Sequence, residues 1–342
     1  MTDHEKPLIA LLAAPETSPS VLYGLYDVLL SVGAVYPDMT IGVPGDALLD
    51  VRIVAAAAEP FRCFGNVLVE PHASIADIEQ VDVVIVCDMY TPIDTPLRGR
   101  YPDEVDWLRR MHAKGALLAS VCTGSLMLAE TGLLDGRPCA GHWAYRDLYR
   151  TAYPAIDFRE DSILNLTSET DRVITGGGVT AWQDLALHLI ARLCGPEHAS
   201  RTAKVFLLSG HEDGQLPFAA MNRQARTGDA VIRSCQTWID EHFAIANPVA
   251  AMTERSGLKP RTFARRFRAA TGYRPMEYVH ALRVEEARQI IETGGVAIDD
   301  VGYEVGYEDP TFFRRLFKRT TGLTPAAYRR KFAGIVEIRR AS

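Results

Sequence analysis

The sequence predicts an α/β domain built on a parallel sheet, followed by an all-α domain that contains one helical unit twice. Continuous apolar strands alternate with helical patterns up to about residue 195, whereas only helical patterns follow Asp229. Near the end of the chain, a set of aromatic, basic, glycine and proline positions recurs after 50 residues. Such a recurrence in one register indicates two copies of one supersecondary unit.

Four apolar runs in the first domain predict buried strands, and a helical pattern follows each of them. The strands are expected at residues 8–13, 81–86, 116–121 and 173–175, and the helices at 20–32, 103–114, 122–132 and 180–194. Continuous apolar strands alternating with helices are typical of a parallel sheet that helices cover on both faces. Ligands of such a sheet bind in the turns that follow the carboxyl ends of the strands.

The boundary between the domains is expected where the composition changes. Gly195 and Pro196 end the last helix of the α/β pattern, because together they form a strong helix-breaking signal. We assign residues 1–208 to the α/β domain and residues 209–228, which are polar and rich in turn formers, to a linker. Residues 229–342 then form the all-α domain.

The charge is distributed unevenly between the two domains. The whole chain has a formal net charge of −6, but the part from Asp229 onward has 19 Lys and Arg against 14 Asp and Glu, a balance of +5. The remainder then has a balance of −11. A basic module attached to an acidic body indicates that the second domain binds a polyanion.

Composition disfavours membrane, secreted and metal-binding proteins. No run approaches the roughly 18 apolar residues of a membrane span, and the first residues lack the pattern of a secretion signal. The six cysteines show neither a CxxC pair nor a metal-ligand spacing, so we expect no metal and no cofactor. Unpaired cysteines of this kind fit a reduced cytoplasm, and we expect no contact with a membrane.

Each copy of the repeat contains a short helix, a glycine-containing turn and a second helix with a basic outer face. The second helices are predicted at residues 260–270 and 310–320, each with a proline in its first turn and, in the later copy, with Asp309 as N-cap. This arrangement is a helix-turn-helix, whose second helix enters the major groove of DNA, and a helix at residues 276–292 would connect the two copies. The matched positions are Phe263, Arg265, Phe267, Arg268, Thr271, Gly272, Pro275 and Tyr278 in the first copy, and Phe313, Arg315, Phe317, Lys318, Thr321, Gly322, Pro325 and Tyr328 in the second.

From about Asp229 to Phe332 the chain resembles the AraC/XylS family of transcription regulators. The signature of the family's second motif stands at residues 301–307 as Val-Gly-Tyr-Glu-Val-Gly-Tyr and continues through 312–318 and 322–329, with glycine in place of the usual alanine at Gly302. The resemblance implies that the two recognition helices enter successive major grooves of double-stranded DNA. It implies base-reading roles for Arg261, Ala264, Arg265, Thr311, Arg314 and Arg315.

The residue types leave two roles open for the basic side chains. Arginine can bind guanine with two hydrogen bonds, but most protein contacts with DNA are made to phosphates. We expect base contacts from Arg265 and Arg315, and phosphate contacts from Arg266, Arg268, Lys318 and Arg319. The predicted DNA-binding set is Arg261, Thr262, Ala264, Arg265, Arg266, Arg268, Thr311, Arg314, Arg315 and Lys318.

Cys122 stands where a predicted strand turns sharply into a helix. Such an elbow exposes its side chain, and the following helix N-terminus would favour the thiolate. His142 follows about 20 residues later. Together these residues resemble the PfpI-type, class I glutamine amidotransferase-like superfamily, and in particular the GlxA-like regulators that join this domain to an AraC-type module. The resemblance covers residues from about 7 to 195 and implies a flavodoxin-like parallel sheet.

The enzymes of this superfamily also use an acidic residue, and the corresponding position here is Val21. Glu16 lies five residues earlier and could reach the same cavity. A cysteine and histidine without an orienting acid lack the usual third member of a nucleophilic site, so we expect no catalysis. Cys122 and His142 could line an effector pocket, could merely pack, or could catalyse a hydrolytic reaction. The candidate pocket residues are Glu16, Cys122, Thr123, His142, Trp143 and Gly177.

The sequence therefore predicts a cytoplasmic, DNA-binding regulator of transcription. The α/β domain would sense a small molecule, form dimers, or do both, and the resemblance makes a nitrogen-containing metabolite a plausible effector. A homodimer is expected from the family and from half-site symmetry, and RNA polymerase is a further plausible partner. The alternative is a cysteine-dependent hydrolase or amidase that carries a DNA-binding module.

Overall fold

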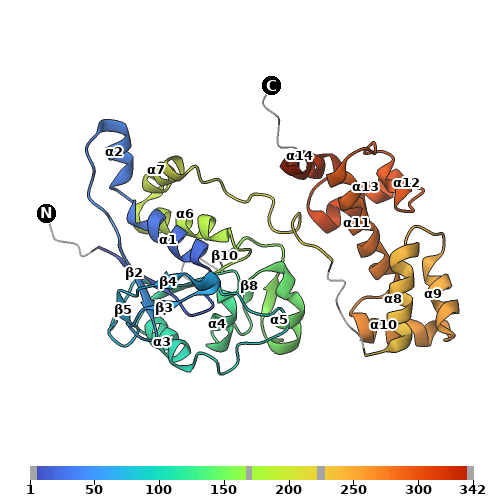
Figure 1. Cartoon of the computed structure of the whole chain (residues 1–342), viewed down its shortest axis with the longest axis horizontal. Coiled ribbons are helices and arrows are strands. Elements are labelled where there is room, and N and C mark those ends of the chain that lie inside the picture. Colours follow the sequence, from blue (N-terminus) through green and yellow to red (C-terminus); the bar gives the residue numbers. More distant parts are fainter. Residues whose placement is uncertain (1–5, 167–171, 222–227, 337–342) are drawn as a thin grey trace. The chain divides into compact units, whose positions relative to one another are not determined.

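The computed structural model describes residues 6–166, 172–221 and 228–336. The chain divides into two compact units, Met1–Gln215 and Leu216–Ser342 (Figure 1). The predicted linker is shared between them, since residues 209–215 belong to the first unit and residues 216–221 to the second. Residues 222–227 of that linker lie outside the described residues.

The first unit is built on a seven-stranded sheet with the order β10-β11-β7-β6-β1-β2-β5. All neighbouring strands in this sheet are parallel except the edge pair of β10 and β11. The predicted α/β fold with a mostly parallel sheet is confirmed. The strands are β1 (Leu8–Leu12), β2 (Asp50–Ala55), β5 (Ala73–Ser74), β6 (Val83–Val86), β7 (Leu117–Val121), β10 (Leu164–Leu166) and β11 (Val173–Gly176).

Helices cover both faces of the sheet, which explains the continuous apolar runs of its central strands. Figure 1 shows α1 (Pro19–Leu30) and α6 (Ala181–Cys194) on one face, and α3 (Pro102–Ala113), α4 (Gly124–Glu130) and α5 (Arg146–Ala152) on the other. Two further helices, α2 (Val35–Ile41) and α7 (Pro196–Phe206), contact each other. Two-residue strands β3 (Phe61–Arg62) and β4 (Leu68–Val69) form a small hairpin, and β8 (Pro138–Ala140) pairs with β9 (Asp157–Arg159).

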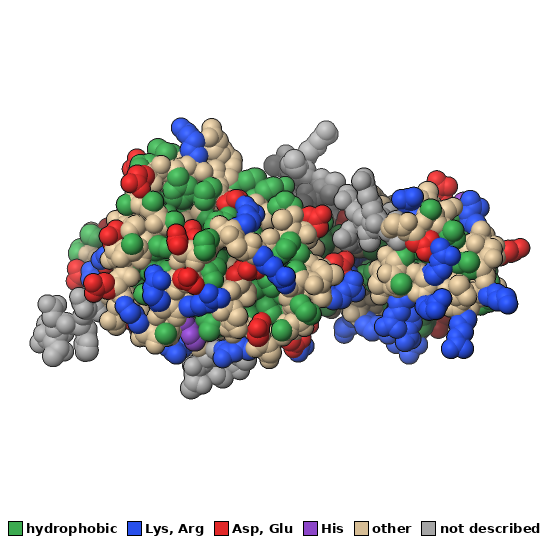
Figure 2. Space-filling model, turned by 90° about the horizontal axis from the view of Figure 1, so that it is seen from below, with side chains coloured by type: hydrophobic (Ala, Val, Ile, Leu, Met, Phe, Trp, Pro, Cys, Tyr) green, Lys and Arg blue, Asp and Glu red, His purple; other side chains and the backbone are tan. Residues whose placement is uncertain are grey.

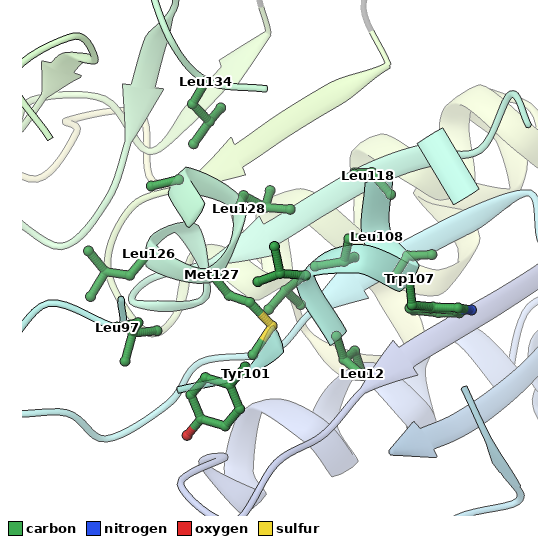
Figure 3. Close-up of a cluster of buried hydrophobic side chains, with 14 of the residues drawn as sticks. Leu12, Leu97, Tyr101, Trp107, Leu108, Leu118, Leu126, Met127, Leu128 and Leu134 are labelled. Carbon is green, nitrogen blue, oxygen red and sulfur yellow. The ribbon is translucent and has the colours of Figure 1, made fainter. Parts of the chain in front are cut away.

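The core between the sheet and α3 and α4 is closely packed (Figure 3). Trp107 of α3 is fully buried and lies among leucines of the sheet and of α4. Burying one large apolar side chain of this kind stabilises a fold by roughly 1.5–3 kcal/mol. The side chains labelled in Figure 3 are Leu12, Leu97, Tyr101, Trp107, Leu108, Leu118, Leu126, Met127, Leu128 and Leu134.

The second unit is entirely helical in its described part and contains the two predicted copies. Its helices are α8 (Ala230–His242), α9 (Pro248–Ser256), α10 (Pro260–Thr271), α11 (Pro275–Thr293), α12 (Val301–Glu304), α13 (Pro310–Thr321) and α14 (Pro325–Val336). The predicted second helices of the two motifs correspond to α10 and α13, and the predicted connecting helix corresponds to α11.

The repeat in the sequence is a repeat of aromatic packing. In the first copy, the rings of Phe263 and Phe267 lie 5.4 Å apart, and the ring of Tyr278 meets Phe267 edge-on at 5.4 Å. In the second copy, Phe313 and Phe317 are 5.7 Å apart, and Tyr328 meets Phe317 edge-on at 5.4 Å. Both recognition helices also end at a glycine with positive φ, +80° at Gly272 and +77° at Gly322, the usual helix C-cap conformation.

The central helix α11 joins the two copies through Arg283. Its side chain is 5% exposed and donates hydrogen bonds to the carbonyl oxygens of Phe243 (2.7 Å), Ile245 (2.9 Å) and Gly306 (2.8 Å). Phe243 and Ile245 precede the first motif, whereas Gly306 lies in the turn of the second. One guanidinium group therefore fixes the two motifs relative to each other within this unit.

Within the described residues, no single helix is long and apolar enough to cross a membrane. The bent pair of α1 and α2 passes that test by length and composition only, with a bend of 61°.

Candidate functional site

The outer face of α10 carries four of the predicted DNA-binding residues. Phe263 and Phe267 are buried, and at 3.6 residues per turn this directs Arg261, Arg265 and Arg268 outward, where all three are exposed. A shallow groove of about 780 Å³ runs beside this face. Its lining includes Ala264, Arg265, Arg268, Ala269, Arg274 and Met276.

The outer face of α13 has the same construction. The carboxylate of Asp309 accepts a hydrogen bond from the backbone N–H of Thr311 at 2.8 Å, so the predicted N-cap is confirmed. Thr311, Arg314, Arg315 and Lys318 are all exposed. Arg314 forms an ion pair with Asp299, which is also exposed, so its guanidinium group can exchange this partner for DNA at little cost. Figure 2 shows Lys and Arg side chains gathered on one side of this unit.

Arg266 differs from the other predicted DNA contacts. Its guanidinium group donates two hydrogen bonds to the carboxylate of Asp229, at 2.8 and 2.9 Å. The same carboxylate caps α8 by accepting from the N–H groups of Val231 (3.1 Å) and Ile232 (3.2 Å). Arg266 therefore fastens α10 to α8. The repeat contains a signal for this role, because the residue at the matching position is the buried Leu316.

In the first unit, Cys122 lies at the elbow between β7 and α4. Its φ of +54° is unusual for a residue other than glycine, and the sharp turn predicted from the sequence is present. Gly124 allows this turn to approach β6, because a Cβ at that position would lie 2.4 Å from the carbonyl oxygen of Val86. The expected exposure of the thiol is wrong, since Cys122 is 3% exposed.

Asp88, which the sequence analysis missed, lies at the centre of this site. Its carboxylate accepts hydrogen bonds from the hydroxyl groups of Ser18 (2.6 Å) and Thr123 (2.7 Å). Burial, and next the adjacent Asp88, raise the pKa of the Cys122 thiol well above its ordinary value. The expected thiolate is therefore wrong: α4 has only seven residues, and burial and the carboxylate outweigh its N-terminus. The available signal was a charged residue two positions after Val86, the last residue of an apolar strand.

His142 lies in the loop after β8, next to Trp143 and Tyr145. Its Nδ1 atom accepts a hydrogen bond from the backbone N–H of Ala144 at 3.2 Å, and its ring centroid is 5.1 Å from that of Trp143. Burial lowers the pKa of His142, and the charge of Asp88 partly opposes this effect. Among the hydrogen bonds of the described residues, none joins His142 to Cys122.

Glu16 and Gly177, the remaining predicted pocket residues, make contacts of their own. The carboxylate of Glu16 accepts hydrogen bonds from Arg100 (2.5 Å) and Tyr101. Ser18, two residues later, is the residue of this loop that donates a hydrogen bond to Asp88. Gly177 packs against the side-chain amide of Gln215.

Comparison with known proteins matches both units to families. Residues 26–192 match the model of the DJ-1/PfpI family, and residues 252–331 match that of a helix-turn-helix domain. The regulator CdhR of Pseudomonas aeruginosa is 27% identical over 281 residues, which cover 80% of each chain. The regulator GlxA of Rhizobium meliloti is 26% identical over 228 residues, which cover 66% of this chain and 68% of that protein. Isonitrile hydratase of Pseudomonas putida is 31% identical over 193 residues, which cover 56% of this chain and 74% of the enzyme.

The chain belongs to the transcriptional regulators that join a DJ-1/PfpI domain to an AraC-type helix-turn-helix domain. It is a DNA-binding protein, and the resemblances seen in its sequence are confirmed.

The position predicted to match the acidic residue of the superfamily's enzymes lies in the core of this domain. Val21 of α1 is fully buried in the core, on the side of the sheet where α1 and α6 pack. A carboxyl group that raises the pKa of the Cys122 thiol comes instead from Asp88, after β6.

Proposed function

We propose that the DJ-1/PfpI domain of this regulator senses a small cationic nitrogen compound. The supporting observation is Asp88, which is 5% exposed and, among the described residues, has only neutral hydrogen-bond partners. A buried carboxylate without a counter-charge is costly, so a ligand with an ammonium group would relieve this cost on binding. The aromatic rings of Trp143 and Tyr145 lie beside His142 and can pack on such a cation.

In the same proposal, the domain binds its ligand without transforming it. The similarity to isonitrile hydratase makes an enzyme the alternative reading. Burial and Asp88 raise the pKa of the Cys122 thiol, however, which makes it a poor nucleophile, and no hydrogen bond among the described residues joins it to His142. Turnover of an isonitrile that depends on Cys122 would contradict this part of the proposal.

On the DNA side, we propose that α10 and α13 enter successive major grooves and that Arg265 and Arg315 contact base edges. The regulator would act in the cytoplasm as a homodimer, and it would reach RNA polymerase from its DNA site. The repeat supports this reading, because α10 and α13 each present an exposed arginine at the matching position.

The test of the DNA-binding mode is selective enrichment of random DNA with the full-length protein at physiological salt. We expect a motif with two contact blocks about one helical turn apart for each pair of helices. Binding that is sensitive to salt but without a recovered motif would contradict sequence-specific recognition by the free protein.

The test of the effector class is thermal stabilisation by a panel of small amines and by carboxylates of matched size. A ligand at 100 times its Kd stabilises the folded state by about 2.7 kcal/mol. We expect amines to raise the Tm, and Asp88→Asn to abolish the effect. Asp106→Asn is the matched control, because that carboxylate lies on the exposed surface of α3. Stabilisation by carboxylates alone would contradict a cationic effector.

A further inference from the structure

Gln215, the last residue of the first unit, is anchored beside the loop that carries His142. Its side chain is 3% exposed. The Nε2 atom donates hydrogen bonds to the carbonyl oxygens of Gly141 (3.0 Å) and Ser162 (2.8 Å). Because Gly141 directly precedes His142, the side-chain amide of Gln215 links the end of this unit to the loop on one side of the Asp88 site.

The segment that leads to this anchor, residues 209–215, is fitted to the surface of the α/β unit. The imidazole of His211 bonds to the carboxylate of Asp184 at 2.6 Å, and its backbone N–H donates to the same group at 3.0 Å. Gly214 has a φ of +66°, and a Cβ there would lie 2.6 Å from the carbonyl oxygen of Asp161. A Cβ on Gly177 would lie 2.2 Å from Nε2 of Gln215. The two glycines therefore make room for residues 209–215, which we call the connector, and for the side-chain amide of Gln215.

The anchor is nevertheless incomplete. The Oε1 atom of Gln215 is buried and has no hydrogen-bond partner within the described parts of the chain. A buried acceptor without a donor costs free energy, which release into water would recover. This cost weakens the attachment of residues 209–215 to the α/β unit, which makes the segment easier to release.

We propose that Gln215 is the positioning residue that couples the Asp88 site to the connector. A ligand that displaces the loop at Gly141 and His142 withdraws an acceptor from the amide and releases residues 209–215. Leu216, the next residue, belongs to the helical unit, where its carbonyl oxygen accepts a hydrogen bond from Arg288 at 3.0 Å. The inference rests on the proposed sensor function, and the ligand acts only through tighter binding to the released form.

Hydrogen exchange in the full-length protein, without DNA, tests the anchor. We expect the backbone amides of residues 209–215 to exchange at least tenfold faster in Gln215→Ala. We expect the same in Gly177→Ala, because the added methyl group displaces the Gln215 side chain without replacing it. Glu212→Ala is the matched control, because Glu212 is an exposed residue of the same segment, and its exchange should equal that of the unchanged chain. Unchanged exchange in Gln215→Ala would overturn the proposal.

Coupling to the Asp88 site is tested by combining variants. Asp88→Asn removes the negative charge, as a bound cation would, and should speed exchange of residues 209–215 severalfold. In the Gln215→Ala background, Asp88→Asn should cause no further increase in the exchange rate. An equal increase in both backgrounds would show that Gln215 has only a structural role and would overturn the coupling. Asp88→Ser, which also removes the negative charge, replaces Asp88→Asn if that variant does not fold. Because no DNA is present, failure of the operator selection leaves this result intact.

Discussion

Cys122 combines the backbone of a nucleophilic elbow with surroundings that suppress its chemistry. The strained turn is retained, but burial and Asp88 raise the pKa of the thiol, so the thiolate fraction at any given pH is smaller than that of a free cysteine. We predict that iodoacetamide alkylates Cys122 far more slowly than free cysteine at pH 8.5, near the ordinary thiol pKa of about 8.5. Mass spectrometry of the labelled peptide measures the rate.

A partner variant separates the two causes of this low reactivity. Asp88→Asn removes the carboxylate but leaves the burial unchanged, so we expect alkylation of Cys122 to become several times faster. Alkylation of Cys194, whose pKa is raised by burial alone, should stay the same. Rapid alkylation of the unchanged protein would show instead that the site holds a reactive thiolate.

In the proposed DNA-binding mode, Arg265 is the residue on which base reading by the first motif depends most. We predict that Arg265→Ala costs about 1–3 kcal/mol on the selected operator and relaxes the preference at one base position. Binding titrations on the operator and on single-base variants measure both effects. Equal weakening on all sequences would make Arg265 a phosphate contact.

At the scale of elements, the sequence revealed those whose periodicity is simple. The strands that became β1, β6, β7 and β11 are continuous apolar runs, and the repeat placed α10 and α13 within a residue of their observed ends. The strand β2 was missed because Asp50 and Arg52, which form an ion pair, interrupt its apolar run. Neither periodicity nor resemblance could show that Ser18 rather than Glu16 meets Asp88, since that depends on how two loops fold together.

The junction of α8 with α10 depends on one carboxylate. Asp229 caps α8 and also holds Arg266, so Asp229→Ala removes both a cap and an ion-pair partner. We predict a lower free energy of unfolding, mostly because α8 loses its cap. Arg266→Ala should lower stability less and leave the base preference of the operator unchanged. Urea denaturation and the operator titrations measure these effects, and weaker binding of all DNA sequences by the folded Arg266→Ala variant would return Arg266 to the phosphate contacts.

For the whole molecule, the charge balance of +5 in the residues from Asp229 onward makes the affinity for DNA depend on salt concentration. This dependence can show how many protomers bind. The logarithm of the affinity falls with the logarithm of salt concentration by about 0.9 for each phosphate contact. Arg268 is exposed on α10, so its replacement by alanine should remove one such contact from each bound protomer without affecting folding.

The change in slope therefore counts protomers. If a homodimer occupies the operator, Arg268→Ala reduces the magnitude of the slope by about two, whereas a bound monomer loses about one. We predict the larger change for the full operator and the smaller one for DNA that contains a single half-site. Titrations at several salt concentrations measure both slopes, and analytical ultracentrifugation of the complexes checks the stoichiometry independently. A change of about one on the full operator, with one protomer in the sedimenting complex, would show that this regulator reads its site as a monomer.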